Sequence, residues 1–431
     1  MTKEKSREAS ESFLWGVATS AFQIEGYVRN DMTDWEAQGR FRKNGKDPRY
    51  EHAVGHWQKW REDFDLLKQL HVNAYRFSVE WARIQPERNR FDEQALDQYE
   101  RMVDRLLELD IVPMLTLHHF THPCWFHDKT PWHEPQSVEA FLVYVDKVLR
   151  RLGDRIRFYI TINEPVVWVL AAYGDAQFPP GYKNFDYIMR ALHHLLRAHK
   201  ESYACIKRYQ SAASVGLAKN FIIFRPRQKV NLLHQGLVYL CHSFYNLLLL
   251  EAFKKNRLKF RVPFLFHYDE AVRLENCLDF WGVNYYYRLH MGLNWSLQQP
   301  IDMHFNRNPV EGNSDLGWEI YADGLWEVLR WVRETGKPMY ITENGIADRD
   351  DRLRKSYLQH HLRVVNKAVQ KGYPLKGYFH WSLLDNYEWL EGREARFGLI
   401  GVDYSNSLRR TLRESGQYYS QWIKNFNPTK K

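Results

Sequence analysis

Cysteine is scarce in this chain of 431 residues, and the scarcity limits the classes of protein to which the chain can belong. The four cysteines are Cys124, Cys205, Cys241 and Cys277, and no two of them form a C-x-x-C pair. This disfavours a disulfide-stapled secreted protein and a cysteine-based zinc site. The first twelve residues are polar and charged, without the apolar segment of a secretory signal. We therefore expect residues 1–12 to form a disordered tail and the protein to be cytoplasmic.

Long apolar runs, linkers and glycine-rich phosphate loops are also missing. No uninterrupted apolar run approaches the ~20 residues of a membrane span, and Leu247–Leu250 is at most a segment of a buried helix. No stretch rich in Pro, Gly or Ser divides the chain, so we expect residues 1–431 to form a single domain. Residues 16–20, at the end of the first apolar run, lack the G-x-G-x-x-G pattern of dinucleotide-binding folds.

The formal net charge is +9, which raises the question of a polyanionic partner. The basic residues form neither a tail nor one long run, so we expect no nucleic-acid partner and no membrane partner. A basic nucleic-acid binder is kept as an alternative, and it would show strongly salt-dependent retention on polyanions.

The chain does contain eight short apolar runs without polar alternation, the pattern of parallel strands buried on both faces. They are Phe13–Thr19, Ala74–Val79, Val112–His118, Phe158–Asn163, Ser214–Lys219, Leu278–Tyr286, Pro338–Thr342 and Leu375–Ser382. Amphipathic stretches with helical spacing lie between them: Trp57–Leu70, Ala95–Leu109, Val138–Leu152, Tyr187–Ile206, Tyr321–Val332 and Leu353–Val369. Eight alternating units fit a (β/α)8 barrel or a doubly wound open sheet, and the missing phosphate loop favours the barrel.

Catalytic groups of such barrels lie at the C-terminal ends of the strands. Two predicted strand ends carry a glutamate in an apolar setting, Glu164 and Glu343, each beside an asparagine. A carboxylate buried there is costly unless it is hydrogen-bonded or paired. Two carboxyl groups across one barrel mouth are what glycoside hydrolysis requires, although two structural glutamates would give the same pattern.

Five segments follow one another on separate predicted strands. They are Phe13–Gly26 (FLWGVATSAFQIEG), Tyr75–Ser78 (YRFS), Thr161–Pro165 (TINEP), Tyr340–Gly345 (YITENG) and Gly377–Trp389 (GYFHWSLLDNYEW). With these segments the chain resembles glycoside hydrolase family 1, the β-glucosidase family, from about Phe13 to Tyr419. The resemblance implies a (β/α)8 barrel that hydrolyses O-linked β-D-glycosides with retention, through a covalent glycosyl-enzyme and without cofactor or metal.

The resemblance also implies roles for individual residues. Glu164 matches the family's acid/base and Glu343 matches its nucleophile. Arg76, Asn284 and Tyr286 match the residues around that nucleophile. The positions that match sugar-binding residues are Gln23, His119, Asn163, Trp381, Glu388, Trp389 and Phe397. Arg76 would keep Glu343 ionised, while the anionic Glu343 and an apolar setting would keep Glu164 protonated. The expected partner is a small β-glycoside, and the oligomeric state stays open.

Three features depart from the family pattern. Phe120 follows His119 where the family commonly has Trp, which leaves the hexose preference open. The segments Asp31–Gly45 and Arg225–Glu275 are differently built from the usual loops around the leaving group, and Ile301–Gly317 is expected to be a long polar loop. Leaving-group preference therefore does not follow from the sequence.

Several alternatives stay open beside a glucosidase, galactosidase or fucosidase. A non-catalytic sugar-binding relative usually lacks one catalytic carboxylate, and both are present here. Phosphosugar hydrolases of the family typically have Ser at the position of Glu388, and thioglucosidases have Gln at that of Glu164. Transglycosylation depends on how well water competes for the intermediate. A metal cluster of His118, His119, His122, Cys124 and His127 is disfavoured, because strand alternation sends His118 and His119 to opposite sides.

Overall fold

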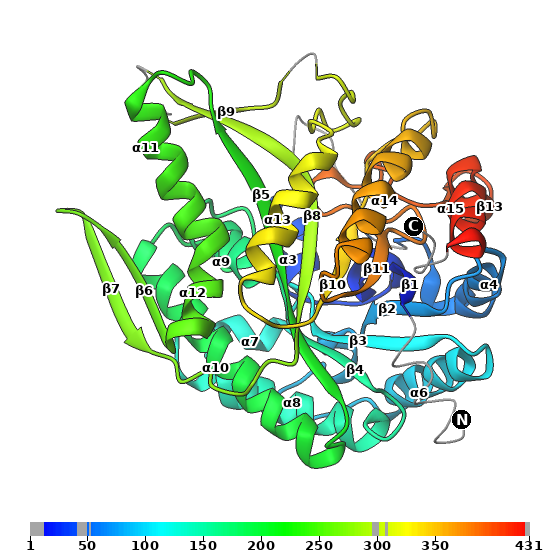
Figure 1. The fold of residues 1–431 in the computed structure, drawn as a ribbon. Helices are drawn as coiled ribbons and strands as arrows, with labels where there is room; N and C mark the ends of the chain where they lie inside the picture. Colours follow the sequence, from blue (N-terminus) through cyan, green and yellow to red (C-terminus); the bar gives the residue numbers. More distant parts are fainter. Residues whose placement is uncertain (1–12, 41–49, 51–52, 295–300, 307–308, 427–431) are drawn as a thin grey trace.

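The computed structural model describes residues 13–40, 50, 53–294, 301–306 and 309–426 (Figure 1). The expected tail, residues 1–12, and the second part of the segment Asp31–Gly45 lie outside the described residues. The fold is built around one sheet whose strands follow one another around a closed ring, with helices outside it.

Eight parallel strands form the predicted (β/α)8 barrel. They are β1 (Leu14–Ala18), β2 (Ala74–Ser78), β3 (Val112–His118), β4 (Phe158–Asn163), β5 (Ser214–Pro226), β8 (Phe280–Leu293), β10 (Met339–Asn344) and β11 (Leu375–Trp381). Each pairs with its neighbour in this order, and β11 pairs with β1, so the ring closes. All eight strands were predicted from the apolar runs, and the barrel is confirmed.

The predicted helices cover the outside of this ring. They are α4 (His56–Gln69), α6 (Glu93–Glu108), α8 (Gln136–Leu152), α10 (Phe185–Tyr209), α13 (Ala322–Arg333) and α14 (Arg354–Gln370). In α6 the side chain of Asp92 accepts a hydrogen bond from the backbone N–H of Ala95, which caps the first turn. Its residues Leu96, Tyr99 and Val103 recur at helical spacing and are buried against the barrel.

Shorter elements complete the connections between strands and helices. These are α2 (Ala21–Glu25), α3 (Asp31–Ala37), α5 (Trp81–Ile84), α7 (Cys124–Lys129), α9 (Pro165–Tyr173), the short helix η2 (Trp389–Glu391), the pair β12 (Ile400–Asp403) and β13 (Arg409–Leu412), and α15 (Glu414–Asn425). The short elements that directly follow the C-terminal ends of barrel strands lie at the barrel mouth and position the site.

Two barrel strands are longer than the sequence pattern predicts. The strand expected to end at Lys219 continues to Pro226, and the one expected to end at Tyr286 continues to Leu293. Their upper halves pair with each other, and β9 (Ile301–His304) pairs antiparallel with β8. The expected polar loop Ile301–Gly317 therefore begins with a strand. These extensions rise from the barrel mouth as an extra wall (Figure 1).

The segment Arg225–Glu275 forms a helix and a hairpin on that wall. The helix comprises α11 (Leu232–Cys241), the π-helical turn η1 (His242–Leu247) and α12 (Leu248–Lys255), and the hairpin comprises β6 (Arg257–Val262) and β7 (Phe266–Ala271). Among the described residues, Leu232–Lys255 has the length and mean hydropathy of a membrane-crossing helix, 24 residues and 1.3. Such a helix is weak evidence by itself, and polar residues such as His234 and Gln235 interrupt its apolar run in the sequence.

The barrel interior is packed so closely that Gly16 has no room for a side chain. A Cβ at Gly16 would lie 2.4 Å from the ring of Phe379 and 2.8 Å from the carbonyl oxygen of Ala74. Both neighbours are buried members of the barrel core. Close packing of neighbouring strands below the barrel mouth thus fixes the strands that carry the site.

Replacing Gly16 with Ala should lower the free energy of unfolding by about 1–3 kcal/mol, because a filled core must shift to take the methyl group. Gly236→Ala is the matched control, since a Cβ there meets nothing within 4 Å. That control should be neutral or stabilising by up to about 1 kcal/mol, because Gly is a poor helix former. Urea unfolding followed by circular dichroism measures both, and equal stabilities would contradict the packing argument.

Candidate active site

The two predicted glutamates lie at the C-terminal mouth of the barrel. Glu164 directly follows β4 and precedes Pro165, the first residue of α9, and its backbone φ of 45° is left-handed. Glu343 is the penultimate residue of β10. Glu343 pairs in register with Asn284 of β8, and Asn284 in turn contacts Glu164, so the two carboxyl groups share one neighbour.

A cavity of about 290 Å³ opens between the two glutamates. The predicted residues that line it are Gln23, His119, Asn163, Glu164, Tyr286, Glu343, Trp381, Glu388, Trp389 and Phe397. Arg76 and Asn284, the other two predicted residues, lie beneath the lining and are completely buried. Residues from seven of the eight barrel units thus meet at one place.

Glu343 is held by donors on both of its oxygens. The Arg76 guanidinium donates to Oε1 at 2.5 Å, and the Tyr286 hydroxyl donates to Oε2 at 2.6 Å. Arg76 also donates to the carbonyl of Thr342 and to Oδ1 of Asn163. These contacts place a cation on one carboxyl oxygen of Glu343 and a hydroxyl donor on the other, which fixes the orientation of the carboxyl group.

Glu164 has the opposite environment. Its Oε1 accepts hydrogen bonds from the side-chain amides of Asn284 (2.6 Å) and Asn220 (3.2 Å), and no cation of the described part of the chain forms an ion pair with it. Burial, followed by the negative charge of Glu343, raises the pKa of Glu164 to about 8. Glu164 is therefore protonated at neutral pH while its neighbour is paired with a cation.

A third glutamate, Glu388, faces the same cavity. Its Oε2 accepts hydrogen bonds from the side-chain amides of Gln23 (3.1 Å) and Asn386 (3.0 Å). Burial is the main reason that the pKa of Glu388 is raised to about 8. Glu388 is therefore mostly protonated at neutral pH, although hydroxyl donors entering the cavity would favour its ionised form.

Aromatic rings and a neutral histidine form the floor and one side of the cavity. Burial, with the nearby charge of Arg76, holds the pKa of His119 well below its usual range, and its Nδ1 has no partner among the described residues. The ring of His119 lies nearly parallel to Trp381 and Trp389, with centroids 6.0 and 6.3 Å away. These flat surfaces and the unpartnered nitrogen suit a ring that bears hydroxyl groups.

Sequence reasoning missed Lys219, which lies at the base of the cavity wall. Its buried Nζ donates to the carbonyls of Asn220 (2.7 Å) and Tyr245 (2.6 Å). Tyr245 donates to Asn220, and Asn220 donates to Glu164, so Lys219 fixes a chain of contacts that ends at Glu164. Burial lowers the pKa of Lys219 to about 7. A lysine at the end of a continuous apolar strand was the available signal, because a buried cation requires compensation.

The outer part of the cavity was also absent from the predicted set. It is mostly apolar and includes Phe178, Tyr245, Tyr287, Leu316 and Trp318, beside the polar Gln177 and Glu391. Tyr245 comes from the π-helical turn η1. Tyr287 lies in the extended strand β8, and Trp318 follows that strand in the chain. Of these three residues, Tyr245 lies in the segment Arg225–Glu275, which departs from the family pattern.

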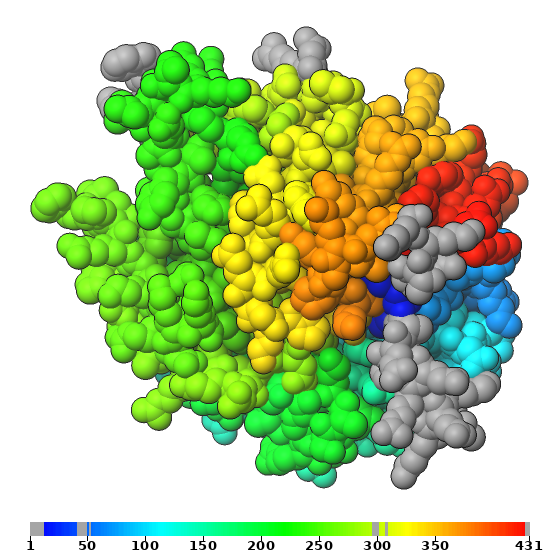
Figure 2. Space-filling model, viewed as in Figure 1, coloured from blue at the N-terminus to red at the C-terminus, as the bar shows by residue number. Residues whose placement is uncertain are grey.

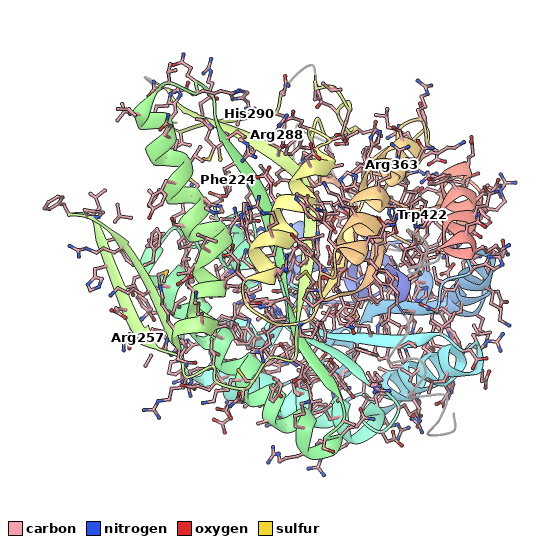
Figure 3. All side chains as sticks on the ribbon, viewed as in Figure 1. Phe224, Arg257, Arg288, His290, Arg363 and Trp422 are labelled. Carbon is pink, nitrogen blue, oxygen red and sulfur yellow. The ribbon has the colours of Figure 1, made fainter. Side chains whose placement is uncertain are left out.

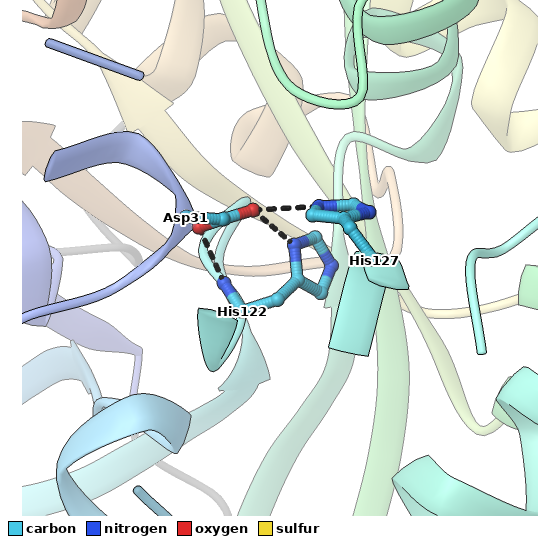
Figure 4. A group of neighbouring side chains, drawn as sticks. All are labelled: Asp31, His122 and His127. Carbon is cyan, nitrogen blue, oxygen red and sulfur yellow. Dashed lines mark hydrogen bonds and ion pairs between the residues drawn. The ribbon is translucent and has the colours of Figure 1, made fainter. Parts of the chain in front are cut away.

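Strand alternation sends His118 and His119 to opposite sides, as predicted, whereas Nε2 of His118 lies 2.8 Å from Nε2 of His122. His119 faces the cavity, whereas His118 packs outside the barrel against Trp132. His122 and His127 instead meet Asp31, which sequence reasoning missed because it is 91 residues from His122 (Figure 4). The ligand atoms of these three residues lie within 4.8 Å of one another.

Hydrogen bonds account for this group without an ion. Oδ2 of Asp31 accepts from Nδ1 of His122 at 2.8 Å and from Nε2 of His127 at 2.7 Å. The other ring nitrogen of His122 accepts from the indole of Trp132. The group ties α3 to the loop after β3 and to α7, and the expectation of no metal stays a prediction.

The opposed environments of the two glutamates can be tested by titration. In protein labelled with 13C at the glutamate carboxyl carbons, Glu164 should titrate at about 8 rather than near its ordinary 4.5. Glu343→Gln should lower the pKa of Glu164 by about one unit or more, because a neighbouring negative charge is removed. Glu394→Gln, on the exposed surface, is the control and should change nothing. An unchanged pKa in the Glu343 variant would contradict the proposed coupling.

Comparisons with known proteins agree with this geometry. The family model for glycosyl hydrolase family 1 matches residues 5–427. Beta-glucosidase A of Thermotoga maritima is 35% identical, with 96% of this chain and 97% of that protein aligned. A beta-galactosidase of Pyrococcus woesei is 29% identical over 98% of both chains. The structure of the family 1 β-glucosidase from Thermotoga maritima superposes with a TM-score of 0.88 at 32% identity, covering 96% of this chain and 98% of that one. The chain therefore belongs to glycosyl hydrolase family 1.

Proposed function

We propose that this family 1 hydrolase cleaves O-linked β-D-glucosides, and also β-D-galactosides and β-D-fucosides, with retention of configuration. The observation that carries the proposal is the pair Glu164 and Glu343 in one cavity, one held protonated and the other paired with Arg76. The names of the relatives in Thermotoga and Pyrococcus support glucosides and galactosides as substrates.

In the first step, Glu343 attacks the anomeric carbon and Glu164 transfers its proton to the leaving oxygen. The bond from the anomeric carbon to the leaving oxygen breaks as a bond to a carboxylate oxygen of Glu343 forms. Arg76 and Tyr286 orient Glu343 for the attack. Fixing the reacting groups in advance removes much of the entropic cost of bringing them together.

In the second step, the roles of Glu164 reverse. Glycosylation removes the charge of Glu343, which after burial is the second cause of the raised pKa of Glu164, so Glu164 ionises more readily. It then takes a proton from water, whose oxygen attacks the anomeric carbon and releases Glu343. Two displacements on opposite faces retain the configuration. The account requires the two carboxyl groups to be about 5–5.5 Å apart.

The sugar ring would lie against Trp381 and be held by hydrogen bonds from the surrounding polar groups. Glu388 and Gln23, which already contact each other, can take neighbouring hydroxyl groups, and His119 and Asn163 can take another pair. Phe397 closes one side of the cavity, and Trp389 lies over Phe22 and beside Phe120. Phe120 supplies no side-chain donor, so hexose selectivity must rest on the other contacts.

Glu388 stands where phosphosugar hydrolases of the family typically have Ser, which argues against phosphorylated sugars. Glu164 argues against a thioglucosidase and, together with Glu343, against a non-catalytic sugar-binding protein. Transglycosylation is the second candidate. The apolar outer part of the cavity favours it, because an apolar acceptor bound there would exclude water from the glycosyl-enzyme.

The proposal is tested by supplying aryl β-D-glucoside, galactoside, fucoside and 6-phosphoglucoside side by side. We expect turnover of the first three and little or none of the fourth. Adding an alkyl alcohol to the glucoside assay measures the share of glycosyl transferred instead of hydrolysed. A preference for the 6-phosphoglucoside, or no turnover of any of the four, would contradict the proposed function.

Replacing Glu388 with Gln should lower kcat/KM for glucosides and galactosides at least about tenfold, or ~1.5 kcal/mol, because charge-assisted hydrogen bonds to hydroxyl groups are lost. Glu394→Gln is a control of the same chemistry on the surface, where its partner is Arg349. Steady-state kinetics on both sugars measure the effect, and an unchanged kcat/KM in the Glu388 variant would exclude Glu388 from sugar binding.

The roles of Glu164 and Glu343 are separated by alanine variants and azide. Glu164→Ala should release dinitrophenol from an activated glucoside in a burst and then stall, because only the second step still needs a base. Azide needs no deprotonation, so it should restore turnover and give the β-glucosyl azide. The products are identified by NMR.

The Glu343 variant provides the opposite pattern. Glu343→Ala should show no burst, and azide should enter on the vacated face to give the α-glucosyl azide in one displacement. An α-product from the Glu164 variant would mean that the two roles are reversed. Full activity in both variants would place the reaction elsewhere.

A further inference from the structure

The outer face of α11 exposes apolar side chains to solvent. Leu232, Leu233 and Tyr239 have exposed fractions of 78%, 68% and 73%. Leu232 and Tyr239 are seven residues apart and lie on one face, and Leu233 points about 100° to the side of that face. The opposite face of the helix packs through Leu237 and Val238 against the extended strands β5 and β8, in a cluster that includes Phe224 (Figure 3). The described part of the fold therefore leaves this apolar face exposed to solvent.

The tip of the β6–β7 hairpin is a second exposed apolar element. Phe264 and Leu265, between the two strands, are almost fully exposed. The hairpin is nevertheless anchored, because Phe260 packs on Phe185 of α10 and on Phe244 of η1. Figure 2 shows the hairpin and α11 as two protrusions on the same side of the molecule. An anchored hairpin with an exposed apolar tip is suited to insertion into another apolar phase, because its tip packs in no core of the described part of this protein.

Positive charge is concentrated around these two protrusions. The segment of residues 225–273 contains nine lysines and arginines but only three acidic residues, so it carries most of the net charge of +9. Alternation along β6 places Leu258 and Phe260 inward and Arg257, Lys259 and Arg261 outward. Lys229 and Val230 immediately precede α11, and Val230 is 91% exposed. Apolar tips surrounded by cations are typical of surfaces that bind anionic membranes.

Against the expectation of no membrane partner, we propose that the outer face of α11 and the tip of the β6–β7 hairpin dock this enzyme on an anionic lipid bilayer. Phe264, Leu265 and Leu232 enter the apolar boundary, and the surrounding lysines and arginines contact the headgroups. A second copy of the chain is the less favourable occupant, because an isologous contact would bring the same positive segment onto itself. The cytoplasmic leaflet, which carries anionic lipid, fits the compartment that the sequence suggests.

The helix lies on the bilayer and does not cross it. Asn246, in the middle of Leu232–Lys255, is buried and exchanges two hydrogen bonds with the backbone of Ile222 on β5. Tyr245 of the same turn forms part of the wall of the active-site cavity. One continuous helix therefore carries both the docked face and Tyr245 of the cavity wall, which positions the cavity near the lipid surface.

Vesicle sedimentation tests the proposal with the full chain. Vesicles of phosphatidylcholine mixed with phosphatidylserine should bind the protein at low salt, whereas phosphatidylcholine alone should bind it much more weakly. High salt should weaken the binding, because screening shortens the reach of the charges. Lys229→Glu and Arg261→Glu should each weaken binding roughly fivefold or more.

Apolar variants test the insertion itself. The double variants Leu232→Glu with Leu233→Glu, and Phe264→Glu with Leu265→Glu, should each weaken vesicle binding roughly tenfold or more. Val143→Glu is the control, because Val143 is an exposed apolar residue of α8, away from both protrusions. Every variant should hydrolyse a soluble aryl glucoside at the wild-type rate, which shows that it is folded and separates docking from the proposed function.

Three results would overturn the proposal. The first is equal binding, or no binding, of the wild type to the two kinds of vesicle. The second is vesicle binding that survives both double variants. The third is a dimer in sedimentation velocity that the Leu232 and Leu233 double variant dissociates, because the exposed face would then be an interface between two copies of the chain.

Discussion

The guanidinium of Arg76 connects the parts of the barrel on which the site depends. From β2 it reaches Thr116 on β3, Asn163 on β4 and both Thr342 and Glu343 on β10. Removing one partner of such a buried ion pair typically costs about 3–5 kcal/mol. The closed ring of strands makes the network possible, because β2, β4 and β10 are far apart in the chain and adjacent or opposed only in a barrel. The network also fixes Asn163 and Thr342, the neighbours of Glu164 and Glu343 in the chain.

Two identical side chains have different chemistry because the network treats them differently. Glu343 receives a cation and a hydroxyl donor, whereas Glu164 receives only neutral amides and the repulsion of Glu343. The difference comes from neighbours and burial, so one chain can offer a nucleophile and a proton donor at the same pH. Lys219, beneath Asn220 and Tyr245, extends this control to the outer wall of the cavity.

The barrel was predictable because its strands are short, continuously apolar and each followed by an amphipathic helix. Glu164 and Glu343 could be found since a lone carboxylate at the end of such a strand is conspicuous. The upper halves of β5 and β8 were not predicted, because pairing outside the barrel leaves no distinctive run, as in Asn220–Pro226. The meeting of Asp31 with His122 and the raised pKa of Glu388 depend on tertiary packing, which no local pattern encodes.

The central claim is that Glu343 forms a covalent bond to the sugar. An activated 2-deoxy-2-fluoro-glucoside tests it most directly, because the fluorine slows the second step and lets the glycosyl-enzyme accumulate. Mass spectrometry of the digested protein should find one fluoroglucosyl group, on the peptide that contains Glu343. The same label on the peptide that contains Glu164, or turnover with no covalent adduct at all, would contradict the account.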